Sequence, residues 1–225
     1  MAVRLLILAA LVGCSDTSLT PTASKRLTIV SLSPALTDTL VALGASDQLV
    51  GVSRYCSMPR GLALPRLGGV QDRPLEAIGS LKPSLIITSD SQRGPAAPLE
   101  RAGFNVQRFS EGGLEAVLAT FGQLANAIGR PKQGAQLTAQ VRADLAQLAH
   151  PITPASRSIL VVFSSQGEPV SQAWAVGAGG WLNDIISHVG LMNPLGSEGL
   201  SYVQLSTEGI IELQPEIIVE LHGEA

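Results

Sequence analysis

The sequence predicts an α/β protein with two similar lobes joined by a long helix. Short β-rich runs alternate with helical patterns from Arg26 onward, an order that is typical of largely parallel sheets. A long glycine-poor stretch, Pro131 to Ala149, divides this alternation into two blocks, and a short sequence pattern occurs once in each block. Because 45% of the 225 residues are hydrophobic, the chain can bury a sizeable core.

The first block opens with a β-rich run, Leu27 to Leu32, that is followed by clear helix signals. Ser33 and Pro34 are suited to the N-cap and the first turn of a helix, and Gly44 is suited to its C-terminal end. Further strands are expected at 49–53, 85–88 and 105–109, and helices are expected at about 98–102 and at 114–128.

The stretch from Pro131 to Ala149 is expected to form one long helix. Ala, Gln, Leu and Arg dominate it, and its apolar residues recur at helical spacing. Pro151 and Pro154 end the helix, and a strand is expected at 158–163. The helix is either an ordinary core element or a rigid connector between two lobes.

The repeated pattern runs from Glu76 to Pro83 and from Glu208 to Pro215, and the two copies agree at four of eight positions. Each copy predicts a short helix with an exposed Glu in its first turn, stopped by Pro and followed by a buried strand. Two lobes of similar design would explain the repeat. Chance recurrence of a common helix-Pro-strand connection is the alternative.

The N-terminus has the anatomy of a signal peptide. Arg4 precedes an apolar run, Leu5 to Val12, that is too short to span a bilayer as a helix. The run leads into Gly13 and Cys14, which resemble a bacterial lipobox. We therefore expect residues 1–13 to be a signal peptide, Cys14 to carry lipid, and residues 14–25 to form a flexible tether. A buried strand with a chance Cys is the alternative.

The charge balance limits the expected partners of the chain, and the cysteine count limits its disulfides. The 15 Lys and Arg residues against 18 Asp and Glu residues give a net charge of -3, so nucleic acid is not an expected partner. If Cys14 is lipidated, Cys56 has no disulfide partner. Cys56 is then either simply accommodated in the fold, or a reactive thiol or ligand contact.

No catalytic constellation is visible, so we expect no enzyme, no metal site and no cofactor. His150, His188 and His222 are not spaced as metal ligands, and the run from Gly177 to Gly180 lacks the spacing of a dinucleotide-binding loop. A tight turn before a helix explains that run better. A Gly-x-Ser-x-Gly elbow is also missing from the sequence.

Several phrases in order resemble the helical-backbone class, class III, of periplasmic substrate-binding lipoproteins that serve ABC importers of vitamin B12, ferric siderophores and haem. The phrases are Thr28-Ile-Val-Ser-Leu-Ser-Pro34, Leu43-Gly-Ala, Val50-Gly-Val-Ser-Arg-Tyr55-Cys-Ser-Met-Pro59, Leu67-Gly-Gly69, Leu75-Glu-Ala-Ile78, Leu81-Lys-Pro83 and Gly179-Gly-Trp-Leu-Asn-Asp-Ile-Ile-Ser-His-Val-Gly190.

The resemblance implies two Rossmann-like lobes, joined by one long helix, with a ligand cleft between them. We expect the N-terminal lobe at residues 26–130, the connecting helix at 131–150 and the C-terminal lobe at 151–225. Members of this class usually continue beyond the strand expected at 216–221, so an incomplete second lobe is also an expectation.

The expected ligand-binding residues are aromatic, because planar apolar rings suit a macrocycle or chelate. The resemblance matches Tyr55 and Tyr202 to aromatic cleft positions, one from each lobe, and their rings are expected to face one another. Trp174 and Trp181 flank the Gly-rich turn, and all four aromatic residues are expected in connections. Weaker polar candidates are Ser33, which has capping as its alternative role, Gln71 and Ser164.

The resemblance implies a monomeric protein in the periplasm or at the cell surface, held to the membrane by lipid, that captures a metal chelate for an ABC importer. A corrinoid is slightly favoured over a ferric siderophore or haem. Glu76 and Glu208 are the expected docking residues for the importer. The alternatives are a secreted α/β hydrolase, with His188 beside a carboxylate and a Ser, and a surface adhesion protein.

Overall fold

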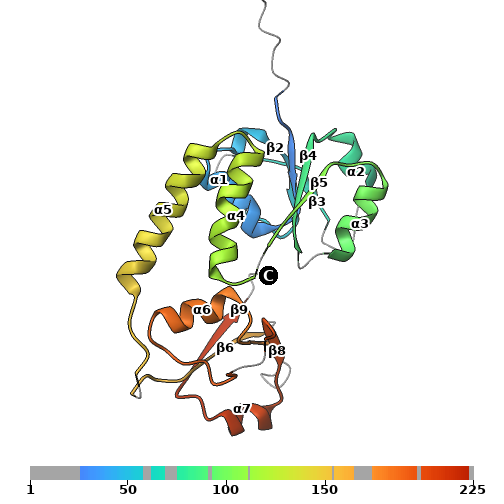
Figure 1. Ribbon diagram of the computed structural model, residues 1–225. Helices are drawn as coiled ribbons and strands as arrows, with labels where there is room; N and C mark the ends of the chain where they lie inside the picture. Colours follow the sequence, from blue (N-terminus) through green and yellow to red (C-terminus); the bar gives the residue numbers. More distant parts are fainter. Residues whose placement is uncertain are drawn as a thin grey trace, which may run out of the picture.

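A computed structural model describes residues 26–57, 62–68, 75–90, 93–110, 112–153, 155–164, 174–196 and 199–222. Two lobes are visible, each built on its own sheet, with one long helix running beside the N-terminal lobe toward the C-terminal lobe (Figure 1). The expected signal peptide, Cys14 and the tether lie outside the described residues, as does Gln71. None of the helices in the described ranges is both long and apolar enough to cross a membrane.

The N-terminal lobe contains a five-stranded sheet in which every pairing is parallel. Its strand order is β3 (Arg66–Leu67), β2 (Leu49–Ser53), β1 (Ile29–Ser31), β4 (Leu85–Ser89) and β5 (Val106–Phe109). Separate hydrophobic clusters cover its two faces. One face packs against α1 (Pro34–Ala42) and α4 (Leu114–Ala127), and the other against α2 (Leu75–Ser80) and α3 (Arg93–Arg101). A short 3-10 helix, η1 (Ser46–Gln48), precedes β2.

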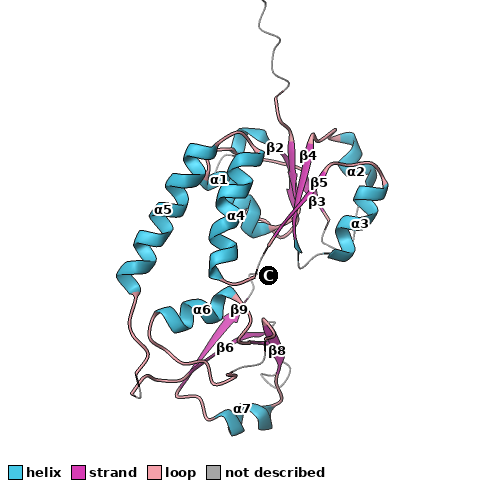
Figure 2. Ribbon diagram, in the orientation of Figure 1, coloured by secondary structure: helices cyan, strands magenta, loops and turns pink. Residues whose placement is uncertain are grey.

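The C-terminal lobe contains a four-stranded mixed sheet. Its order is β8 (Tyr202–Gln204), β7 (Trp174–Val176), β6 (Ile159–Ser164) and β9 (Ile217–His222). Strands β6 and β9 are parallel, whereas β7 is antiparallel to both of its neighbours, which departs from the expected parallel order. Helices α6 (Trp181–His188) and α7 (Thr207–Leu213) pack into separate clusters of this lobe, and α6 lies on the side toward the N-terminal lobe (Figure 2).

The repeat predicted from the sequence corresponds to equivalent turns in the two lobes. Lys82, between α2 and β4, and Gln214, between α7 and β9, have φ angles of 46° and 45°, and each precedes a Pro. They are the non-glycine residues with positive φ in the described chain. The prediction of a buried strand holds for β4 but is wrong for β9, where Ile218, half exposed, and its neighbours face solvent.

The long predicted helix is confirmed to within one residue as α5 (Pro131–Leu148). It packs against α4, and Gly134 is its one buried residue. A Cβ added at Gly134 would lie 2.4 Å from the Ala125 Cβ and 3.2 Å from the Phe121 carbonyl oxygen. Glycine therefore permits the close approach of the two helices.

Gly134→Ala should lower the free energy of unfolding by about 1 to 3 kcal/mol, because the added methyl group overpacks the α4–α5 contact. Gly122→Ala is the matched control, since a Cβ there meets nothing within 4 Å. The control should be neutral or stabilising by about 0.5 to 1 kcal/mol through helix propensity. Urea unfolding of both variants checks this, and equal effects would contradict the packing role of Gly134.

Candidate ligand-binding site

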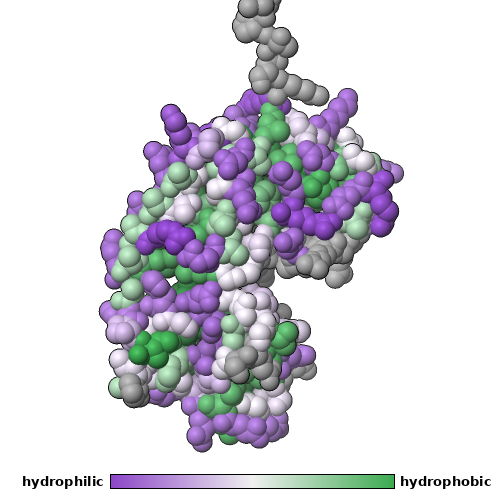
Figure 3. All heavy atoms as spheres, viewed as in Figure 1, coloured by the Kyte–Doolittle hydropathy of each residue, from purple (hydrophilic) through white to green (hydrophobic). Residues whose placement is uncertain are grey.

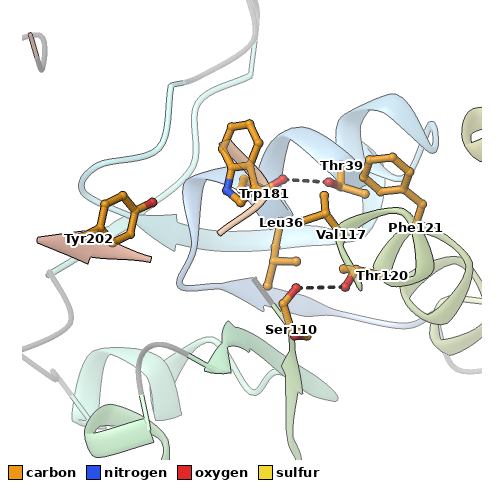
Figure 4. Close-up of a pocket in the computed structure, with 9 residues that line it drawn as sticks. Leu36, Thr39, Ser110, Val117, Thr120, Phe121, Trp181 and Tyr202 are labelled. Atoms are coloured by element: carbon orange, nitrogen blue, oxygen red, sulfur yellow. Dashed lines mark hydrogen bonds between the residues drawn. The ribbon is translucent and has the colours of Figure 1, made fainter. Parts of the chain in front are cut away.

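A pocket of about 450 Å³ lies between the two lobes, within the range of small-molecule sites, which is about 300 to 1,000 Å³. In the space-filling view the molecule narrows between the lobes (Figure 3). The walls come from both lobes (Figure 4). The N-terminal lobe contributes Ala35, Leu36, Thr39, Ser110, Val117, Thr120 and Phe121, and the C-terminal lobe contributes Trp181 and Tyr202.

Two threonine hydroxyl groups of this pocket donate their hydrogens to nearby backbone carbonyls. Thr39 donates its hydroxyl hydrogen to the Ala35 carbonyl at 2.8 Å. Thr120 donates to the carbonyls of Ala116 and Ser110, at 3.1 and 3.2 Å (Figure 4). Once a hydroxyl has donated its hydrogen, only its lone pairs remain for a ligand. The described lining holds no charged side chain.

An open aromatic hollow adjoins this pocket on the C-terminal lobe. It has a volume of about 430 Å³ and is lined by Phe163, Trp174 and Tyr202. The rings of Phe163 and Tyr202 meet edge to face, with centroids 5.6 Å apart and an interplanar angle of 75°. Tyr202, a residue that is 46% exposed, borders both spaces, so its side chain is available to a planar ligand in either of them.

The structure brings together some of the aromatic residues predicted for the site. Trp181 and Tyr202 line the interlobe pocket, and Trp174 lies in the adjoining hollow. These three residues begin α6, β8 and β7, so the expectation that they lie in connections was wrong. Tyr55 is in the turn after β2, where the residue is 65% exposed and its ring lies near the Arg54 guanidinium. It is not among the described lining residues, and its place opposite Tyr202 stays a prediction.

The polar candidates are less well placed. Ser33 is 2% exposed and caps α1, with its hydroxyl accepting from the Leu36 N–H, so its capping role is confirmed. Ser164 ends β6, and its side chain is outside what the structure describes.

Cys56 belongs to a buried polar cluster beneath α1. The Thr37 hydroxyl lies 3.2 Å from the Cys56 sulfur and donates to the Ser31 hydroxyl at 2.8 Å. Burial raises the pKa of the Cys56 thiol, which keeps it protonated. Burial and a raised pKa favour accommodation over reactivity for this thiol.

The histidine singled out for a hydrolase makes a structural contact. His188 Nε2 lies 2.7 Å from the Leu145 carbonyl oxygen, which can only accept, so this nitrogen donates. The described residues contain no group of three or more His, Cys, Asp or Glu side chains that could hold a metal ion.

The two carboxylates predicted for docking are both exposed in first turns, Glu76 in α2 and Glu208 in α7. Hydrogen bonds from its own backbone N–H and from Ser206 lower the pKa of the Glu208 carboxyl. Glu208 is therefore charged at neutral pH and available at the surface of the C-terminal lobe.

Sequence reasoning missed most of the N-terminal wall of the pocket. Thr39, Val117, Thr120 and Phe121 lie on helices, where their spacing resembles an ordinary amphipathic pattern. Phe163 was missed as well, because it ends a strand-like apolar run. The one available signal was the presence of polar Thr residues on the apolar helix faces.

Comparison with known proteins gives consistent matches over nearly the whole described chain. A family model described as periplasmic binding protein matches residues 29–222. The vitamin B12-binding protein of Vibrio cholerae is 26% identical over 215 residues, which cover 92% of this chain and 76% of that protein. The uncharacterized ABC transporter substrate-binding lipoprotein YvrC of Bacillus subtilis is 26% identical over 205 residues, 87% of this chain and 63% of that protein.

Two solved structures also match this chain over most of its length. The periplasmic haem-binding protein HutB of Vibrio cholerae has a TM-score of 0.74 at 26% identity, over 87% of this chain and 76% of that chain. The periplasmic vitamin B12-binding protein BtuF of the same organism has a TM-score of 0.72 at 26% identity, over 86% of this chain and 75% of that chain.

Proposed function

The chain belongs to the periplasmic binding protein family, and we propose that it captures a metal chelate outside the cytoplasm and delivers it to an ABC importer. It is a binding protein with the two-lobed fold of its structural neighbours, and not an enzyme. The observation that carries the proposal is the interlobe pocket, whose walls come from both lobes and whose C-terminal side is aromatic.

A corrinoid is the favoured ligand, because the described lining is uncharged and the Thr39 and Thr120 hydroxyls already donate their hydrogens to backbone carbonyls. The carboxamide side chains of a corrinoid offer N–H donors to Thr39 and Thr120. The carboxylates of haem would be favoured by a cationic partner, and the described lining contains no Lys, Arg or His side chain. Haem and ferric siderophores are the next candidates, and haem is the ligand named for HutB.

The purified protein should bind cyanocobalamin more tightly than haemin or a ferric hydroxamate, as measured by absorbance or fluorescence titration. Tyr202→Ala should weaken cyanocobalamin binding by about 1 to 3 kcal/mol, because a large aromatic contact is lost. Ile152→Ala is the control, since Ile152 is exposed and lies outside both pockets. Binding of none of the three chelates would count against transport.

The second proposal is that Glu76 and Glu208 dock onto the importer. The two residues occupy the repeated element of the two lobes, and both are exposed. A carboxylate in each lobe at an equivalent position suits a receptor with two-fold symmetry. In the simpler alternative, each Glu only interacts favourably with its helix dipole, which is worth about 0.3 to 1 kcal/mol.

Glu76→Lys and Glu208→Lys should each impair chelate uptake and complex formation with the importer while leaving chelate affinity nearly unchanged, because rim charges act mainly on encounter. Glu212→Lys is the matched control, an exposed carboxylate on the same helix as Glu208. If reversal of both docking residues leaves uptake intact, only the dipole role remains.

The third proposal is that Cys14 carries the lipid that holds the protein to a membrane, as its lipobox-like context indicates. Cys14→Ser should then appear in the soluble fraction or as uncleaved precursor after membrane fractionation. Cys56→Ser is the comparison variant, which should keep the wild-type distribution. Unchanged membrane partitioning of the Cys14 variant would refute the anchor.

A further inference from the structure

Helix α6 contacts the rest of the molecule outside its lobe at both of its ends. At its start, the Trp181 N–H donates to the Gly112 carbonyl at 3.1 Å, and Asp184 Oδ2 accepts from the Leu114 N–H at 2.7 Å. At its end, His188 Nε2 donates to the Leu145 carbonyl of α5 at 2.7 Å. One helix of the C-terminal lobe is thus held by α4 and by α5.

The Asp184 contact replaces a local helix cap. Gly113 occupies the N-cap position of α4 and has no side chain to satisfy the first N–H groups of that helix. The carboxylate of Asp184, 70 residues away in the sequence, supplies the acceptor. A Cβ on Gly113 would lie 2.8 Å from Asp184 Oδ2, so glycine leaves room for this carboxylate.

The N-terminal ends of α4 and α6 favour a negative charge at the position of the Asp184 carboxylate. Asp184 lies in the first turn of α6 and bonds to the first residue of α4, so its charge is close to the positive ends of two helices. In the described chain, the ion pairs of Lys and Arg side chains do not include Asp184. The backbone N–H of Leu114 is therefore its main partner on the other lobe.

The two helices joined by this contact contribute wall residues to the interlobe pocket, one helix from each lobe. Val117, Thr120 and Phe121 belong to α4, and Trp181 is the first residue of α6. In the view of Figure 4, Trp181 is drawn between Tyr202 and the α4 side chains Val117 and Phe121. A shift of α6 relative to α4 would change the separation of these walls directly.

We infer that Asp184 is a positioning residue, which fixes the spacing of the two pocket walls by capping α4 from the opposite lobe. It acts on affinity through α4 and Trp181 and need not touch the ligand. This inference rests on the proposed function for its effect on chelate binding, but the effect on lobe geometry does not depend on any ligand.

The ligand-free test measures the distance between the lobes. Spin labels are placed at Ala77→Cys on α2 and Glu212→Cys on α7, both exposed, in a Cys14→Ser background, with Cys56 buried. Asp184→Ala should broaden or shift the distance distribution obtained by pulsed electron paramagnetic resonance. Asp184→Asn keeps an oxygen that accepts the Leu114 N–H, so this variant should restore most of the wild-type distribution.

Glu115→Gln is the matched control. Glu115 is in the first turn of α4 and pairs with Arg142 of α5, so its loss removes a carboxylate beside the contact without affecting α6. The Arg142 hydrogen bond lowers the pKa of the Glu115 carboxyl, so Glu115→Gln removes an ionised group. The control should leave the distance distribution unchanged.

The ligand-dependent test uses cyanocobalamin. Asp184→Ala should weaken its binding by up to about fivefold, the effect expected if the typical free energy of a lost helix cap is transmitted in full to the pocket, mainly through faster dissociation. Asp184→Asn should lose less. An unchanged distance distribution in Asp184→Ala would overturn the inference. A changed distribution with unchanged affinity would overturn its role in binding. If the wild type binds no chelate, the proposed function fails, and the distance measurement alone decides the role of Asp184.

Discussion

The structure depends on the contacts that hold the two lobes, each with its own hydrophobic core, in one relative arrangement. The described buried clusters of the N-terminal lobe share no residue with those of the C-terminal lobe, so apolar packing alone does not fix one lobe against the other. Polar contacts at the ends of α6 and the course of α5 supply that link. The binding pocket adjoins the α4–α6 contact, since both of these helices contribute residues to its walls. Small changes at helix ends are therefore transmitted directly to the ligand site.

The pocket has the character expected for a large, partly apolar ligand. Its aromatic side comes from Trp181 and Tyr202, and the Thr39 and Thr120 hydroxyls donate their hydrogens to carbonyls of their own helices. Such a site orients a ligand through a few polar contacts while most of the affinity comes from buried apolar area. The equivalent positions of Glu76 and Glu208 in two matching turns extend the same two-lobed design to the outer surface.

Local signals in the sequence predicted much of the fold. Ser33 and Pro34 predicted the start of α1, and helical spacing predicted α5 to within one residue, because caps and periodicity act over a few residues. Strands β3, β7 and β8 have two or three residues each and were missed, since pairing with neighbouring strands determines them. Trp181 and Tyr202 were predicted for the site, but Thr39, Thr120 and Asp184 were not. Their roles depend on partners or walls that are distant in the sequence, as the Asp184–Leu114 contact illustrates.

The central claim is that an intact chelate binds between the lobes, against α4 on one side and Trp181 and Tyr202 on the other. A crystal structure of the protein grown with cyanocobalamin, with data collected at the cobalt absorption edge, tests this most directly. We predict one strong anomalous peak within the interlobe pocket, with the corrin ring against the Tyr202 side chain. A cobalt peak on the outer surface, or an empty pocket in crystals that contain bound cobalamin elsewhere, would contradict the account.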